Sequence, residues 1–359
     1  MINILIYIIV FFLTFILNEI ASIIYKKKKM LSNILIMSSF LILLIFVGCR
    51  YYVGTDYESY LNIYNTVSSF DVSELNLIDI ELGAKLLFKL IYILFDNQYL
   101  IFIGLALLTL YPIYKANKLY DYKYLGYSIL TYCFMFLPFC MNGMRQGVAM
   151  SFILLAFAYL FKNKKINMIM AFIIAFMFHK SSILLLPYIV LFLFRKDKIG
   201  EIDSIVITLI LACILFFFNG ALMKVGIISD YEYLLGALNI EDVSFKSILL
   251  FIPYILIMLS YDNKLEKHIN EIKGLVVSGI ILTLIGTTRQ FLSRISLYHL
   301  MFLTLLIPFL INNINNKTNK IIIKLFYIIY LVIYFIYEFY ISGKHEIFPY
   351  QSWLIGIGG

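Results

Sequence analysis

Long apolar runs alternate with short polar or charged segments along almost the whole chain. Twelve runs are long enough, or nearly long enough, to cross a hydrocarbon core of ~30 Å as α-helices. They cover residues 2–25, 31–49, 99–114, 125–140, 147–161, 166–178, 183–194, 204–219, 247–260, 275–286, 295–311 and 321–337. The pattern predicts an all-α polytopic membrane protein of about 12 transmembrane helices, folded as a single integral membrane domain over residues 1–359.

One further run, Leu82–Phe95, decides the orientation of everything after it. If it does not cross the membrane, the later basic groups at 115–123, 162–165, 195–198, 264–273 and 317–324 share the side of residues 26–29. Because Lys and Arg concentrate in cytoplasmic loops, we expect this run to be an outer re-entrant or amphipathic helix. Both termini then lie outside the cytoplasmic membrane, with an outer segment at 50–98 and a second outer loop at 220–246.

Composition limits the class of protein. With 62% hydrophobic and only 14% charged residues, the chain is not a soluble domain with an ordinary polar surface. The chain has 29 Lys and Arg and 21 Asp and Glu, and these charges lie mainly in short loops. The excess of basic residues therefore indicates membrane topology and not nucleic-acid binding. The four cysteines lack metal-ligand spacing, and no nucleotide-binding or zinc motif occurs. We therefore expect no disulfide framework, cofactor or metal.

Polar chemistry gathers at one end of a predicted helical hairpin, residues 142–182. A basic loop, 162–165, joins its two apolar runs, and the opposite, outer end carries Arg145, Gln146 and His179. On the expected topology most lysines face inward, whereas four of the five arginines face outward. These are Arg50, Arg145, Arg289 and Arg294. Snorkelling to the lipid interface explains a single outward arginine equally well. Four together favour a phosphate or carboxylate site, because guanidinium holds such groups with paired donors.

The outer face also supplies candidate bases. Asp56 lies in a glycine-containing turn, and Glu81 begins the amphipathic run, where a carboxylate can instead serve only as a helix cap or dipole partner. His179 ends a predicted span, although a lone histidine at a membrane boundary is more often structural. Tyr57 and Tyr298 are aromatic candidates for stacking on a sugar ring.

The order of motifs along the chain resembles that of a family, the EpsG-type, Wzy-like polymerases of bacterial exopolysaccharide, capsule and O-antigen. The residues that carry the resemblance are Arg50 with Val53-Gly54-Thr55-Asp56-Tyr57 and Tyr60, Glu81-Leu82-Gly83, Arg145-Gln146 with Ala149, Phe178-His179-Lys180-Ser181, Arg294 with Tyr298, and Pro349-Tyr350. The Glu81-Leu82-Gly83 motif departs slightly from the Glu-Pro-Gly or Glu-x-Gly form of the family.

The resemblance implies a GT-C-like fold and a metal-independent glycosyltransferase of the bacterial cytoplasmic membrane. Such an enzyme joins oligosaccharide repeat units, carried on undecaprenyl pyrophosphate, at the outer face of the bilayer. The implied partners are the lipid-linked donor and acceptor glycans and the flippase and chain-length regulator of the same pathway. The implied roles are pyrophosphate binding for Arg145, Arg289 and Arg294, substrate positioning for Arg50, Tyr57, Gln146 and Tyr298, and base or acceptor orientation for Asp56, Glu81 or His179.

A flippase or transporter of the same lipid-linked sugars is the main alternative, because outward arginines can bind a pyrophosphate without reaction. Transporters, however, typically show internal repeats and ionisable residues near the membrane midplane. Here no clear repeat is present and the charges concentrate at span ends. A membrane acyltransferase comes third, supported only by His268 in an inner loop.

Overall fold

The computed structural model describes residues 2–194, 201–217, 249–259, 267–286 and 290–354. Its elements, in chain order, are α1 Ile2–Ile24, α2 Lys29–Gly48, α3 Tyr57–Ser69, η1 Val72–Leu77, α4 Leu82–Phe95, α5 Leu100–Tyr120, η2 Tyr122–Tyr124, α6 Leu125–Met135, α7 Leu137–Asn142, α8 Met144–Phe161, α9 Lys165–Phe178, η3 Lys180–Leu185, α10 Leu186–Phe194, α11 Glu201–Phe217, α14 Ile252–Leu259, α15 Lys267–Gly286, α16 Gln290–Leu300, α17 Leu303–Asn312, α18 Lys317–Phe335, η6 Ile336–Ile341 and η7 Lys344–Glu346. The expected all-α class is confirmed for these residues, whose extended backbone pairs in one isolated bridge, Arg50 with Ser352. The second outer loop, 220–246, lies outside the described residues.

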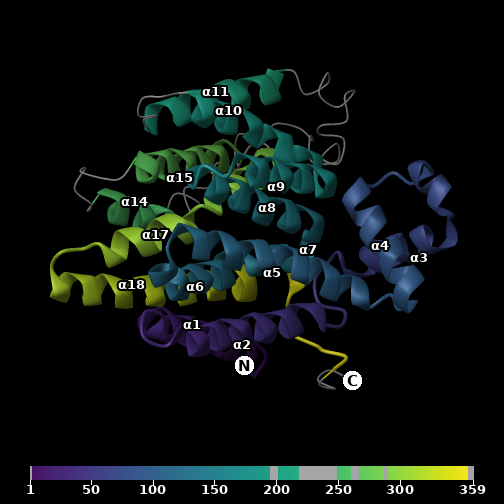
Figure 1. The fold of residues 1–359 in the computed structure, drawn as a ribbon, viewed down its shortest axis with the longest axis horizontal. Helices are drawn as coiled ribbons and strands as arrows, with labels where there is room; N and C mark the ends of the chain where they lie inside the picture. Colours follow the sequence, from purple (N-terminus) through teal and green to yellow (C-terminus); the bar gives the residue numbers. More distant parts are fainter. Residues whose placement is uncertain (1, 195–200, 218–248, 260–266, 287–289, 355–359) are drawn as a thin grey trace.

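The helices pack side by side, with α8 near the middle of the bundle (Figure 1). In α8, 89% of the residues are buried, against 33% in α1 and in α2 and 22% in the span that contains α18. Because α8 is apolar around its whole circumference, α5 and α9 cover it on neighbouring faces. The exposed apolar side chains of α1, α2 and α18 suit contact with lipid.

Six described helices are long and apolar enough to cross a membrane, or seven if α16 and α17, bent by 41°, form one broken span. The expected twelve spans and the GT-C-like fold are therefore not confirmed. Part of the difference comes from local breaks. Phe136 separates α6 from α7, which has Pro138 in its first turn, and the run after His179 begins with the 3₁₀ turns of η3. The 14-residue α4 is not among the candidate spans, in line with its amphipathic pattern.

Residues 50–98, which the sequence predicts to form an outer segment, project from one end of the bundle as α3 and α4 (Figure 1). The beginning of this segment is tied to the C-terminal part of the chain. The Tyr51 N–H donates to the Gln351 carbonyl at 2.9 Å, and the Trp353 N–H donates to the Cys49 carbonyl at 3.2 Å. Tyr350, which directly precedes Gln351, is buried. The Pro349-Tyr350 motif thus belongs to a strap that fixes the base of the outer segment.

Candidate active site

Glu81, Arg145 and His179 meet where the outer segment joins the bundle. The Nη1 group of Arg145 donates to Oε2 of Glu81 in an ion pair. The other carboxylate oxygen, Oε1, lies 2.6 Å from Nδ1 of His179. Glu81 and His179 are buried, whereas the Arg145 side chain is 25% exposed, so Arg145 is the most accessible member of the group. We call these three residues the Glu81 cluster.

Each member of the Glu81 cluster stands at the end of a helix. Glu81 is the N-cap residue of α4, Arg145 is the second residue of α8, and His179 is the C-cap residue of α9. The Glu81 side chain makes no capping bond, so its carboxylate serves its two partners and not the helix. Gly83 allows this approach, since a Cβ there would lie 2.7 Å from the ring of Phe178 at the end of α9.

The charges of the Glu81 cluster are mutually stabilising. Burial alone would raise the pKa of the Glu81 carboxyl, but the hydrogen bond from His179 and the positive charge of Arg145 outweigh it and lower that pKa to about 2. A carboxylate with so low a pKa is a weak base, so Glu81 fits an orienting role better than proton acceptance. By accepting the Nδ1 hydrogen of His179, it sets the imidazole tautomer in which Nε2 accepts a proton.

Two contacts bring α16 to the same site. The side-chain amide of Gln146 donates to the backbone carbonyl of Arg294 at 2.8 Å. The hydroxyl groups of Ser181 and Tyr298 lie 3.1 Å apart. Gln146 follows Arg145 in α8 and Ser181 lies two residues after His179 in η3, so these bonds hold α16 against both α8 and η3 beside the Glu81 cluster.

The turn that contains Asp56 is fixed to the residues just before α8. The side-chain oxygen of Asn142 accepts from the Thr55 hydroxyl at 2.9 Å and from the Asp56 backbone N–H at 2.8 Å. Burial raises the pKa of Asp56, while the positive charges of Arg294 and Arg145 act against that rise. Asp56 therefore lies within electrostatic reach of Arg294 and of Arg145, a member of the Glu81 cluster.

Arg50 and Tyr57 are buried in the protein, a placement that favours a structural role for both. The Arg50 guanidinium donates to three backbone carbonyls at 2.6–3.2 Å, which occupies donors that a sugar contact would need. Burial lowers its pKa to about 10, so it remains charged at neutral pH. The Tyr57 ring stacks on Phe102 with 4.1 Å between centroids. Arg289, the fourth arginine that the sequence predicts to face outward, lies outside the described residues.

Sequence reasoning assigned no role to two neutral residues at this site. Asn142 holds the Asp56 turn, as described above, and the Tyr60 hydroxyl accepts from the Arg145 backbone N–H at 3.3 Å. In the sequence Asn142 looks like an ordinary turn residue, and Tyr60 belongs to a motif of the family without a role of its own, because the importance of both comes from what they touch. Within the described ranges no three His, Cys, Asp or Glu side chains gather as metal ligands.

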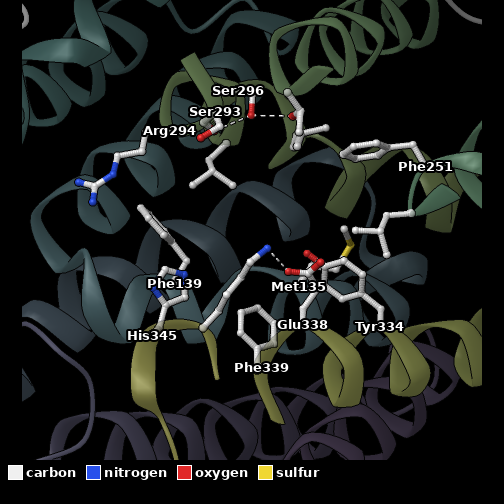
Figure 2. Close-up of a pocket in the computed structure, with 15 residues that line it drawn as sticks. Met135, Phe139, Phe251, Ser293, Arg294, Ser296, Tyr334, Glu338, Phe339 and His345 are labelled. Carbon is white, nitrogen blue, oxygen red and sulfur yellow. Dashed lines mark hydrogen bonds and ion pairs between the residues drawn. The ribbon is translucent and has the colours of Figure 1, made fainter. Parts of the chain in front are cut away.

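A cavity of about 370 Å³ with Arg294 at its edge was also missed (Figure 2). Its lining includes the ion pair between Glu338 and Lys344 and the ring of His345. Burial, with the charges of Lys344 and Arg294, lowers the pKa of His345 to about 4, so this imidazole is neutral at pH 7. In the sequence Glu338 merely follows the predicted span 321–337. The structure extends this helix to Ile341, and Glu338 is then a lone carboxylate within the candidate span Lys317–Ile341, where ionisable residues are often functional.

Comparison with known proteins supports the family that the motifs resemble. The EpsG family matches residues 33–352, which is most of the chain and includes the Glu81 cluster. No match was found among curated proteins or among solved structures. The EpsG match, together with the apolar helices, indicates a membrane protein of the polysaccharide polymerase type. The chain belongs to the EpsG family.

Proposed function

We propose that this protein is a glycosyltransferase that joins oligosaccharide repeat units carried on undecaprenyl pyrophosphate. The observation that carries the proposal is the Glu81 cluster, in which one buried carboxylate holds an arginine and a histidine together. A leaving pyrophosphate needs a cation with paired donors, and an attacking hydroxyl needs a proton acceptor. The cluster offers both groups in one ion-paired unit.

The location of the Glu81 cluster supports a reaction at the outer face of the cytoplasmic membrane. Arg145 begins α8 and His179 follows the end of α9, so both lie at the end of this hairpin opposite the loop 162–165. That loop contains three lysines, and the positive-inside rule assigns it to the cytoplasm. The cluster then faces outward, where a flipped lipid-linked glycan is presented.

The proposed step is a substitution at the anomeric carbon of the donor sugar. The hydroxyl oxygen of the acceptor sugar attacks this carbon, and the bond to the pyrophosphate oxygen breaks, so undecaprenyl pyrophosphate leaves with the bonding electrons. Arg145 and Arg294 stabilise the charge on the leaving group. A guanidinium carries five N–H donors, which allows Arg145 to hold Glu81 and a phosphate oxygen together. His179 accepts the hydroxyl proton at Nε2, and Glu81 stabilises the resulting imidazolium.

Asp56 is the second candidate for the base, because burial raises its pKa and it faces the same arginines. His179→Gln and Asp56→Asn distinguish the two assignments by steady-state kinetics. The variant that removes the base loses kcat, whereas the variant that removes an acceptor-orienting group raises the KM for the acceptor. Loss of kcat in Asp56→Asn with kcat retained in His179→Gln would reassign the base to Asp56.

The glycan that accumulates in cells lacking the protein tests the proposal. A missing polymerase leaves single repeat units on the carrier lipid at the outer leaflet, and re-expression of the wild-type protein restores polymer. Accumulation at the cytoplasmic leaflet would instead identify a flippase, and an undiminished amount of polymer would contradict both functions. We also propose that the protein works beside the flippase and the chain-length regulator of its pathway, which crosslinking from the outer segment can capture.

A further inference from the structure

Aromatic rings and polar groups share the cavity beside Arg294 (Figure 2). Besides the imidazole of His345, its described lining includes the rings of Phe139, Phe251, Tyr334 and Phe339. The volume of about 370 Å³ lies within the range of ~300–1,000 Å³ that is typical of small-molecule sites. The cavity is thus large enough for a ligand of its own.

Glu338 is the main charged group in this cavity. It belongs to the π-helical turn η6, and such local widenings of a helix are frequent at functional sites. Its side chain is 7% exposed and forms an ion pair with Lys344, whose side chain is 58% exposed. Within the described ranges, Lys344 provides the one side-chain bond to this carboxylate, which can accept about four hydrogen bonds. A ligand with several hydroxyl groups would fill the remaining positions and offset the cost of burial.

Hydroxyl groups lie on the wall opposite Glu338 (Figure 2). Thr283 donates to Ser296 at 2.8 Å, and Ser296 donates to the backbone carbonyl of Ser293 at 2.6 Å. The pair of Glu338 with Lys344 carries no net charge, so of the described lining residues only Arg294, at the edge of the cavity, favours an anion. Aromatic faces combined with hydroxyl groups and one carboxylate fit a neutral ring that has apolar faces and a hydroxylated edge. A sugar ring has these properties, so the lining of the cavity suits a sugar.

Arg294, which lines the cavity, is also linked to the residue that follows Arg145 of the Glu81 cluster. The Arg294 side chain points away from the centre of the cavity (Figure 2). Its backbone carbonyl is held by Gln146, the neighbour of Arg145, at 2.8 Å. Its positive charge acts both on Asp56 and on His345. An anion bound between Arg145 and Arg294 would therefore lie next to the cavity and to the Glu81 cluster together.

We propose that this cavity is the subsite for the sugar ring joined directly to the pyrophosphate of the lipid-linked donor. The inference rests on the proposed function and adds where the glycan of the substrate lies. The pyrophosphate binds Arg145 and Arg294, the sugar hydroxyls donate to Glu338, and a face of the sugar ring packs on Phe339. In this position the anomeric carbon lies at the border between the cavity and the Glu81 cluster.

Steady-state kinetics with lipid-linked repeat units, extracted from cells that lack the protein, test the subsite. Glu338→Gln keeps the shape of the side chain and removes the charge that strengthens its hydrogen bonds, so KM should rise ~10–100-fold with little change in kcat. Glu346→Gln is the matched control, because Glu346 is an exposed carboxylate that does not line the cavity. An unchanged KM in Glu338→Gln overturns the subsite.

Cysteine protection gives a second readout that leaves Glu338 intact. The Ser293→Cys variant carries a thiol on the cavity wall, and in a Cys213→Ser background the other cysteines are buried. The lipid-linked repeat unit should slow maleimide labelling of this thiol, whereas undecaprenyl pyrophosphate without sugar should not. Equal protection by both ligands overturns the sugar assignment. A wild-type protein that forms no polymer refutes the proposed function, whereas an active wild type with an unprotected thiol refutes the subsite alone.

Discussion

Glu81 and His179 are separated by 98 positions in the chain and joined by a hydrogen bond of 2.6 Å. The bond exists because Gly83 lets the beginning of α4 press against the end of α9. Through it, a helix that is not a candidate span delivers a carboxylate to the ends of two apolar helices of the bundle. The outer segment therefore supplies one member of the Glu81 cluster.

Replacing Arg145 with lysine should lower the rate of polymer formation by ~10²–10³ while the protein still folds and inserts. The positive charge survives in Arg145→Lys, but lysine cannot offer the planar pair of donors that holds a pyrophosphate oxygen as charge develops. Linkage of lipid-linked repeat units, normalised to the amount of protein, measures the effect. Lys162→Gln, at the far end of α8, is the control and should retain wild-type activity. If Arg145→Lys makes as much polymer as the wild type, Arg145 is only an anchor at the membrane interface.

A methyl group at position 83 should separate the two helices that the glycine brings together. In Gly83→Ala the added Cβ meets the ring of Phe178, so α4 shifts and the bond between Glu81 and His179 lengthens. We expect a loss of ~1–3 kcal/mol in the free energy of unfolding from overpacking, with a fall in kcat. Leu82→Ala, an exposed change in the same turn, should affect neither quantity. Normal kcat in Gly83→Ala would show that the close approach of the helices is not needed.

The Glu81 ion pair should stabilise the protein at neutral pH and lose this effect in acid. The pKa of Glu81 falls from 4.5 to about 2 on folding, so its contribution is fully present above pH ~4.5 and disappears as the pH falls through ~2. The shift corresponds to about 3 kcal/mol at pH 7. Thermal unfolding in detergent should show Glu81→Gln well below wild type at pH 7, with the two converging near pH 2. A constant difference across this range would contradict the assigned pKa.

Arg50 should matter for folding and not for substrate affinity. Arg50→Lys leaves backbone carbonyls without donors in a buried site, which costs ~1–3 kcal/mol in the free energy of unfolding. We expect a lower unfolding temperature and less protein in the membrane, with an unchanged KM in the fraction that folds. A raised KM at normal stability would return Arg50 to the sugar-binding role that the sequence resemblance implies.

Labelling of an introduced cysteine tests the side of the membrane on which the Glu81 cluster lies. Asn163 lies between α8 and α9, at the end of the hairpin opposite the cluster. In a Cys213→Ser background, the Asn163→Cys variant should resist a membrane-impermeant maleimide in intact cells and react after permeabilisation. Ser69→Cys, at the end of α3, should react in both conditions. Reaction of Asn163→Cys in intact cells would reverse the inferred orientation.

The sequence by itself determined the class of protein and predicted on which side of the membrane most polar groups lie. Whether a run can cross a bilayer depends on its length and hydrophobicity. Both are properties of residues that are neighbours along the chain, so they can be read from the sequence. The same local reasoning identified Glu81, Arg145 and His179 as residues at helix ends, because polar groups that interrupt apolar runs stand out. It also predicted that α4 is amphipathic, from the two lysines in its pattern.

Tertiary structure alone decided which of these groups meet and which are structural. Arg50 and Arg145 look alike in sequence, yet packing buries the guanidinium of one among backbone carbonyls and leaves that of the other beside Glu81. Likewise, no local pattern places Glu338 in a cavity beside Arg294. The physical reason is that hydrophobicity is a property of a segment, whereas an ion pair or a cavity depends on how segments far apart in the chain fit against one another.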